Sequence, residues 1–365
     1  MASLHTLHRE QGQSPWLDNL RRGWLTSGEL QQWIDRGVRG VTSNPTIFAK
    51  AMMQTDDYDS DLARLVGEGY STEQAYWSLV VDDLVNALDL LSPVYNSSAG
   101  DDGYVSVEVD PGLANERKQT LEAGLELARR IDRRNLLIKV PATNAGLGAI
   151  SDLLANSVSV NVTLIFGLKR YAEVMEAYIA GLENNPESDL GAVRSVASFF
   201  VSRLDAQIDK QLANIGSAEA LSLQGKAAVA LSKLAYEMFT ETFSGERWAD
   251  LEAKGACVQR PLWASTSTKN PEFSDTLYVD SLIGPQTINT LPDATIDAFI
   301  DHGTVSRTID IDVDEARCVV DRLAGLGIDC ESVATTLELQ GVTAFQGSFD
   351  EVLTSLEARA SALGD

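Results

Sequence analysis

Short apolar segments alternate with longer amphipathic segments along most of the chain. The short segments are rich in Val, Ile, Leu and Phe, which is typical of parallel strands buried on both faces. The longer segments repeat apolar residues at helical spacing, which indicates helices with one buried face. This pattern predicts strands at residues 16–20, 40–45, 104–111, 136–141, 159–165, 193–200, 258–265 and 277–280.

The order of these segments points to one architecture. Eight predicted strands, each followed by helix, within 365 residues favour a closed barrel of parallel strands over an open sheet. We therefore predict an α/β fold, a single (β/α)8 TIM barrel domain over residues 1–365, with additional helices, notably at the C-terminus. Residues 1–14 are expected to be a loosely ordered tail. The C-terminal helices are predicted near 293–302, 312–326, 331–340 and 348–362.

The chain is strongly acidic. It has 53 Asp and Glu against 29 Lys and Arg, a formal net charge of -24. Such a surface repels nucleic acid and anionic membranes, so neither is an expected partner. An anionic substrate would need a local basic site within this repelling field, which makes lysines and arginines near strand ends informative.

Other features argue against metal, disulfide and membrane-bound classes. The three cysteines, Cys257, Cys318 and Cys330, are far apart and odd in number. The three histidines do not form a cluster. No apolar segment resembles a secretory signal or a membrane span, and no G-x-G-x-x-G follows the first strand. We expect a cytoplasmic protein without a cofactor or metal.

One buried strand carries a lysine in its centre. Lys139 follows Leu136, Leu137 and Ile138 and precedes Val140. Burial disfavours the ammonium form, and a free amine is a good nucleophile toward carbonyl groups. A lysine at a strand end can instead extend its ammonium group to water, and this segment alone does not decide between the two.

Polar residues recur at the carboxyl ends of the other predicted strands. In a barrel these ends meet at one mouth, where TIM-barrel enzymes have their active sites. Each residue alone also has a structural explanation, such as a turn former or a helix cap. The set comprises Asp18, Asn44, Glu108, Lys139, Asn161, Thr163, Ser198, Arg203 and Ser265.

This set suits amine catalysis on a ketose. A lysine amine adds to the ketone, and loss of water gives an iminium that withdraws electrons from the neighbouring bonds. Asp18 is a candidate base for carbon–carbon cleavage, while Glu108 and Thr163 are candidates to hold the water that carries protons. Asn44 and Asn161 are candidates to bind substrate hydroxyls.

Six ordered motifs then point to a family. The chain resembles transaldolase in its longer bacterial form over about residues 14–360. The motifs are G-V-T-S-N-P at 40–45, V-S-V-E-V at 105–109, L-I-K-V-P-A-T at 137–143, N-V-T-L-I-F at 161–166, S-F-F-V-S-R-L-D at 198–205 and P-L-W-A-S-T-S-T-K at 261–269.

The resemblance implies a role for each candidate in catalysis. Lys139 corresponds to the Schiff-base lysine of the family. Asp18 corresponds to the acid/base that cleaves the carbon–carbon bond. Glu108 and Thr163 correspond to the pair that controls the catalytic water.

The resemblance also implies the substrate contacts. Asn44 and Asn161 would contact the bound dihydroxyacetone unit, Ser198 and Phe200 would line the pocket, and Arg203 would bind phosphate. Shorter family members have a serine and an arginine close together after the seventh strand. Ser265 fits that serine, but no arginine follows it, and Lys269 is the nearest cation.

The implied reaction transfers a dihydroxyacetone group from sedoheptulose 7-phosphate or fructose 6-phosphate to glyceraldehyde 3-phosphate or erythrose 4-phosphate, in the pentose phosphate pathway. The implied partners are sugar phosphates, and a monomer or homodimer is expected. Two alternatives stay open. One is an aldolase resembling fructose-6-phosphate aldolase, which releases its aldehyde product. The other is a catalytically inactive barrel that binds sugar phosphates.

Overall fold

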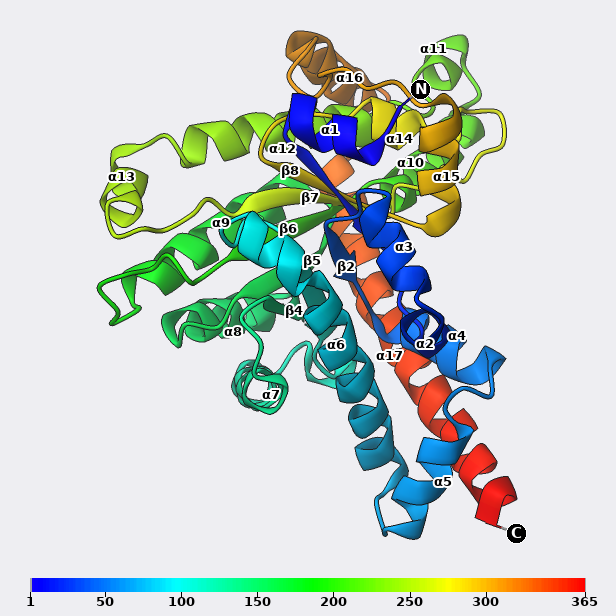
Figure 1. The fold of residues 1–365 in the computed structure, drawn as a ribbon. Coiled ribbons are helices and arrows are strands. Elements are labelled where there is room, and N and C mark those ends of the chain that lie inside the picture. The colour runs from blue at the N-terminus through cyan, green and yellow to red at the C-terminus, as the bar shows by residue number, and fades with distance from the viewer. Residues whose placement is uncertain (1, 365) are drawn as a thin grey trace.

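The computed structural model describes residues 2–364. Eight parallel strands form a closed barrel in chain order (Figure 1). The barrel closes where β1 pairs with β8, from Gln13 opposite Thr287 to Leu17 opposite Leu291. This confirms the predicted (β/α)8 barrel. The strands are β1 Gln13–Leu17, β2 Gly40–Thr42, β3 Tyr104–Glu108, β4 Leu136–Pro141, β5 Val160–Ile165, β6 Ser195–Phe200, β7 Arg260–Ala264 and β8 Thr287–Leu291.

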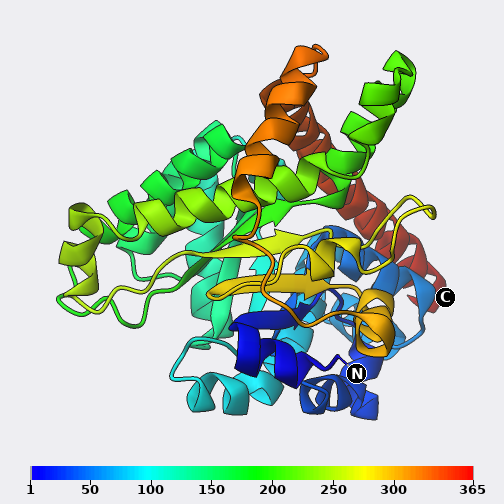
Figure 2. The same cartoon turned by 90° about the horizontal axis from the view of Figure 1, so that it is seen from above.

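Helices surround the barrel and extend beyond it. Figures 1 and 2 show α16 and the segment with α10 and α11 projecting on the same side. The helices are α1 Leu4–Gln11, α2 Arg22–Ser27, α3 Glu29–Asp35, α4 Pro45–Gln54, α5 Asp59–Gly67, α6 Thr72–Ser97, the 3-10 helix η1 Pro111–Leu113, α7 Arg117–Ile131, α8 Asn144–Ala155, α9 Leu168–Glu183, α10 Ser202–Ile215, α11 Ala218–Ser222, α12 Ala227–Thr242, α13 Glu246–Glu252, α14 Leu277–Asp280, α15 Asp293–His302, α16 Val313–Gly325 and α17 Cys330–Gly364. Within residues 2–364, no helix is long and apolar enough to cross a membrane.

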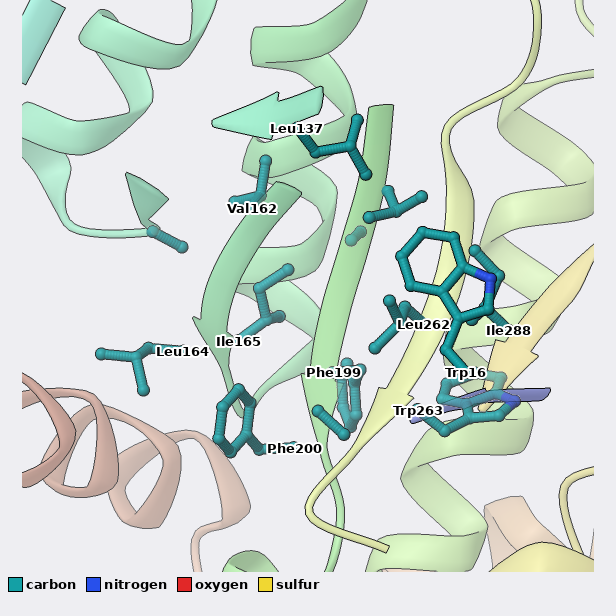
Figure 3. Close-up of a cluster of buried hydrophobic side chains, with 14 of the residues drawn as sticks. Trp16, Leu137, Val162, Leu164, Ile165, Phe199, Phe200, Leu262, Trp263 and Ile288 are labelled. Atoms are coloured by element: carbon teal, nitrogen blue, oxygen red, sulfur yellow. The ribbon is translucent and has the colours of Figure 1, made fainter. Parts of the chain in front are cut away.

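The strands are buried along nearly their whole length because helices cover their outer face and side chains fill the interior. Figure 3 shows the large side chains of this core. Trp16 and Trp263 are completely buried, and the ring of Phe199 meets that of Trp263 edge-on at a centroid distance of 6.3 Å. Burial on both faces explains why most strands appear in the sequence as short apolar segments.

The eighth strand lies later than predicted. Residues 277–280 form the short helix α14, and β8 is Thr287–Leu291. The prediction was wrong because three of the five residues of β8 are polar although all five are buried. Its Asn289 Oδ1 accepts a hydrogen bond from the Thr266 hydroxyl at 2.8 Å, while its Nδ2 has no partner among the described residues.

Residues 4–11 form α1 and residue 13 begins β1, which corrects the prediction of a loose tail at 1–14 for all but Met1, which lies outside the described residues. The Ser3 hydroxyl caps α1 by accepting the Thr6 N–H. Leu4 and Leu7 lie on one face of α1 and are completely buried. Gln13 already belongs to β1, and its amide donates to Leu282 O at 2.7 Å. Two leucines were too weak a periodic signal to predict this helix.

The C-terminal region contains one long helix in place of two predicted ones. The predictions at 331–340 and 348–362 fall within α17, which packs against α4, α5, α6, α10 and β5. Gly341 lies between them and does not break the helix. A Cβ atom at Gly341 would lie 2.9 Å from the Leu164 side chain, so glycine permits α17 to approach β5 closely.

Hydrogen bonds join both ends of α17 to helices around the barrel. Near its start, Glu331 accepts a hydrogen bond from the Leu168 N–H at the beginning of α9, at 2.9 Å. Near its end, Arg359 donates to the carbonyl groups of Met52 and Thr55 at the end of α4. These contacts fix the helix across the barrel end on which the active-site candidates lie.

The burial of α1 gives a stability prediction. We expect Leu7→Ala to lower the free energy of unfolding by about 2–5 kcal/mol, because it leaves a cavity at a fully buried site. Leu339→Ala is the control, since Leu339 is 64% exposed on α17 and should change stability by less than about 0.5 kcal/mol. Thermal and urea unfolding of both variants test this. Equal small effects would mean that the N-terminal helix is not packed in solution.

Candidate active site

A cavity of about 400 Å³ opens at the carboxyl ends of the strands. Most predicted site residues line it, and they come from several strands that are distant in sequence. The remaining three, Glu108, Asn161 and Thr163, are buried on neighbouring strands beside Lys139. The lining members of the predicted set are Asp18, Asn44, Lys139, Ser198, Phe200, Arg203, Ser265 and Lys269.

Lys139 stays inside the barrel. Its residue is only 4% exposed, so the side chain does not extend to bulk water. Its Nζ atom donates a hydrogen bond to Ser43 O at 3.2 Å and lies 3.5 Å from Glu108 Oε2. The Phe345 ring of α17 covers it, with 5.8 Å from Nζ to the ring centroid. The amine therefore has one carboxylate neighbour, an aromatic cover and access to the cavity.

Glu108 is the buried partner of Lys139. Burial raises the pKa of this carboxyl group to about 7, against the opposing effect of the positive charge on Lys139. Within residues 2–364, neither carboxyl oxygen meets hydrogen-bond geometry, and the Thr163 hydroxyl also has no partner. A carboxyl group with a pKa near neutrality can both give and accept a proton at physiological pH.

Asp18 faces the same lysine from another strand. It follows β1 directly and is half-buried. The Thr42 hydroxyl donates to its Oδ1 at 2.7 Å and also meets the Thr290 hydroxyl at 2.6 Å. Burial raises the pKa of Asp18, and the charge on Lys139 opposes that shift. Glu108, next to the amine, and Asp18, in the cavity lining after β1, are thus two carboxyl groups in different environments, which suits two separate proton-transfer roles.

The predicted amide and hydroxyl residues are held in fixed orientations. Asn161 donates to the Ser106 hydroxyl at 3.1 Å and accepts from the Ser198 hydroxyl at 2.7 Å, and all three side chains are buried. Asn44 caps α4, because its Oδ1 accepts the Ile47 N–H at 3.0 Å. These bonds fix the orientation of the Asn44 and Asn161 amide groups, and so determine which of their polar atoms can face a ligand.

Positive charge gathers on one side of the cavity. Arg203 is the second residue of α10, with its guanidinium 5.5 Å from the Phe200 ring centroid, and burial lowers its pKa. Lys269 and Lys50 also line the cavity. Burial and the charges of Arg203 and Lys50 lower the pKa of Lys269. Three cations in mutual range indicate a site for a multivalent anion such as phosphate.

Ser265 lies beside this cationic group. It has a left-handed backbone (φ 55°), and its hydroxyl meets the Ser202 hydroxyl at 2.9 Å. This contact joins the loop after β7 to the first residue of α10. The structure therefore brings Ser265, Lys269 and Arg203 to one cavity, although the sequence separates them.

Three residues of the site were not predicted from the sequence. Thr42 lies within a recognised motif at a strand end, so its position gave a usable signal. Lys50 lies on the exposed face of α4 and has no distinguishing neighbour in the sequence. Phe345 reads as an ordinary buried position of an amphipathic helix, and only the tertiary packing of α17 brings it over Lys139.

The site is organised for amine chemistry. Among the residues that the structure describes, no group of three His, Cys, Asp or Glu side chains is placed to hold a metal ion. The reactive features are a buried amine, two carboxyl groups with raised pKa values, and a cationic rim. Together they can activate a carbonyl compound that also bears phosphate.

Comparison with known proteins agrees with this geometry. The chain is 48% identical to a transaldolase of Mycobacterium bovis over 352 residues, covering 95% of this chain and 94% of that protein. It is 48% identical to a transaldolase of Mycobacterium ulcerans over 357 residues, with 96% of each chain covered. A transaldolase of Mycolicibacterium smegmatis is 47% identical over 355 residues, again with 96% of each covered. Residues 15–356 match the transaldolase/fructose-6-phosphate aldolase family, and the chain belongs to that family.

Proposed function

We propose that this protein is a transaldolase, a transferase that moves a dihydroxyacetone unit between sugar phosphates through a Schiff base on Lys139. The observation that carries the proposal is the position of the Lys139 amine, buried 3.5 Å from Glu108 and open to a cavity with cations on its rim. The relatives named transaldolase, similar over nearly their full length, support the same activity.

The first step forms the iminium. The uncharged Lys139 amine adds to the ketose carbonyl carbon, and the oxygen takes up a proton to give a carbinolamine. The carbinolamine hydroxyl then leaves as water after protonation, and the nitrogen lone pair forms the C=N bond. Glu108, with a pKa of about 7, supplies and recovers these protons. Thr163, buried on β5, is the proposed second contact for the departing water.

The second step cleaves the carbon–carbon bond. Asp18 accepts the proton of the hydroxyl on the carbon beyond the bond that breaks. The bonding electrons move toward the iminium nitrogen, an aldose phosphate departs, and a three-carbon enamine stays on Lys139. An acceptor aldose phosphate reverses these movements. Thr42 orients Asp18 through the 2.7 Å hydrogen bond, so the carboxylate is held toward the cavity.

Transfer requires that water does not release the enamine before an acceptor binds. Phe345 covers Lys139 from α17, and Phe200 lines the cavity against Phe166 at a ring distance of 5.1 Å. We propose that this aromatic lining limits water near the iminium. The alternative within the family is an aldolase that releases its product, and dependence of turnover on an added acceptor distinguishes the two.

The test of the proposal is trapping of the intermediate. Borohydride added with fructose 6-phosphate should leave a reduced three-carbon adduct on Lys139, located by peptide mass analysis. Lys139→Ala should give no adduct and no turnover while keeping a wild-type melting profile. Asp18→Asn should still be trapped, but with the intact six-carbon sugar, because the bond is not cleaved. A folded wild-type protein without an adduct on any lysine would refute the Schiff-base mechanism.

Burial of Glu108 predicts a pH-dependent stability difference. The raised pKa means that the folded state holds the proton more tightly than the unfolded chain does. The stability that the folded state gains from protonated Glu108 is therefore fully present below pH 4.5, the ordinary pKa of a glutamate, and it is lost as pH rises through about 7. Relative to Glu108→Gln, wild type should lose up to about 3 kcal/mol across this range. Melting curves of both proteins from pH 4.5 to 8 measure it, and parallel curves would contradict the assignment.

The cationic rim predicts how phosphate is recognised. Arg203→Gln should raise the KM for phosphorylated acceptors by about 10- to 100-fold, because it removes a charge-assisted hydrogen bond. Lys50→Gln should raise it by up to about fivefold, since Lys50 is exposed. Lys210→Gln is the matched control, an exposed α10 lysine outside the cavity with the same charge change. If these variants raise the KM for unphosphorylated glyceraldehyde by the same factors, Arg203 and Lys50 do not recognise phosphate.

A further inference from the structure

A second cavity lies at the opposite, amino-terminal end of the barrel. It has a volume of about 630 Å³, larger than the catalytic cavity. Tyr104, Ser195 and Arg260 line it, and each is the first residue of its strand. The loop before β7 contributes Cys257, and α1 contributes His8. None of these residues belongs to the proposed catalytic machinery.

Three arginines and one buried carboxylate define the charge of this cavity. Asp102 is 1% exposed and accepts hydrogen bonds from Ser14, Trp16 and Arg39. The Nη1 atom of Arg260 lies 3.5 Å from Oδ1 of Asp102. The positive charges of the two arginines, with these bonds, hold the pKa of Asp102 below its usual value despite burial. Both oxygens of this carboxylate already have hydrogen-bond or ion-pair partners, so Asp102 has little capacity to balance the charge of a third arginine.

Arg194 is that third cation. Its hydrogen bonds all come from Nη1, which donates to the Gly191 and Val193 carbonyl groups. Its Nε is buried and has no partner among the described residues, and the same holds for Nε of Arg260. Neither Nε atom has appreciable accessible surface, so these two N–H groups do not open on the cavity. Nη2 of Arg194 donates no hydrogen bond within the described residues, and it is the guanidinium donor left for a ligand. The acidic lining residues other than Asp102 are the exposed Asp101 and Glu252.

We propose that this cavity binds a small organic anion bearing a phosphate group, with Arg194 as its charged ligand, since both Nη atoms of Arg260 already donate to protein acceptors. A guanidinium group offers paired N–H donors that match phosphate oxygens. Apolar side chains such as Leu137, Val196 and Pro285 supply a wall for the organic part. A protein with a net charge of -24 repels anions in general, so an arginine that Asp102 does not pair with is a local attraction. The proposal is independent of the proposed function.

Cys257 provides a reporter within this cavity. Its thiol is half-buried, and burial raises its pKa. Cys318 is exposed on α16 and Cys330 begins α17, and neither lines the cavity. An anion bound beside Arg194 should therefore shield Cys257 from alkylation without shielding Cys318, which serves as an internal control in the same molecule.

The experiment measures iodoacetamide alkylation at pH 8.5 by peptide mass analysis, with inorganic phosphate, pyrophosphate or glycerol phosphate at constant ionic strength. Alkylation of Cys257 should slow at least fivefold and saturably, while that of Cys318 stays constant. Arg194→Gln should abolish the protection and keep full transfer activity. Arg203→Gln should keep the protection, because it removes phosphate binding only from the catalytic cavity.

Calorimetry provides an independent measurement if Cys257 reacts too slowly. Pyrophosphate titrated into Arg203→Gln should show one binding site per chain, and the double variant with Arg194→Gln should show none. Arg194→Lys keeps the charge and should bind more weakly than wild type, which separates loss of a ligand from loss of folding. Absence of binding in Arg203→Gln, equal slowing of Cys257 in Arg194→Gln, or parallel slowing of Cys318 would overturn the proposal.

Discussion

The burial of one lysine–glutamate pair is the constraint on which the site depends. Lys139 and Glu108 lie opposite each other on adjacent strands, at 4% exposure each, with 3.5 Å between Nζ and Oε2. Removing two charges from water costs several kcal/mol, and their attraction returns only part of it. The closed barrel makes this arrangement possible, because its packed interior holds both strands in register. The raised pKa of Glu108 is a direct result: the same burial that costs stability makes the group a proton donor and acceptor near neutral pH.

The cavity that contains Lys139 carries positive charge although the chain as a whole is strongly acidic. A chain with 53 acidic residues repels the phosphorylated compounds that the family acts on. Arg203, Lys269 and Lys50 all line the cavity, and burial together with the charges of Arg203 and Lys50 lowers the pKa of Lys269. Mutual repulsion among cations is unfavourable without an anion, so binding of phosphate relieves it. The cationic lining of this cavity thus contrasts with the acidic composition of the chain as a whole.

The sequence predicted most of the barrel because strands buried on both faces leave a clear apolar signal, as in β4 and β6. It missed β8, since its two threonines and Asn289 are polar yet buried, with hydrogen bonds inside the protein at the threonine hydroxyls and at Asn289 Oδ1. The site residues that lie at strand ends, including Asp18 and Lys139, could be predicted because barrel topology brings those ends together. Phe345 could not, because its approach to Lys139 depends on how a distant helix packs. Local patterns carry no information on such a long-range contact.

The position of α17 in the chain has a consequence for synthesis. A protein made from its N-terminus exposes its segments in order, and the helix that carries Phe345 is the last to emerge. Until α17 docks between Glu331 and Arg359, the amine of Lys139 lacks its aromatic cover. The cavity around Lys139 is therefore complete only after α17 has been made and has docked.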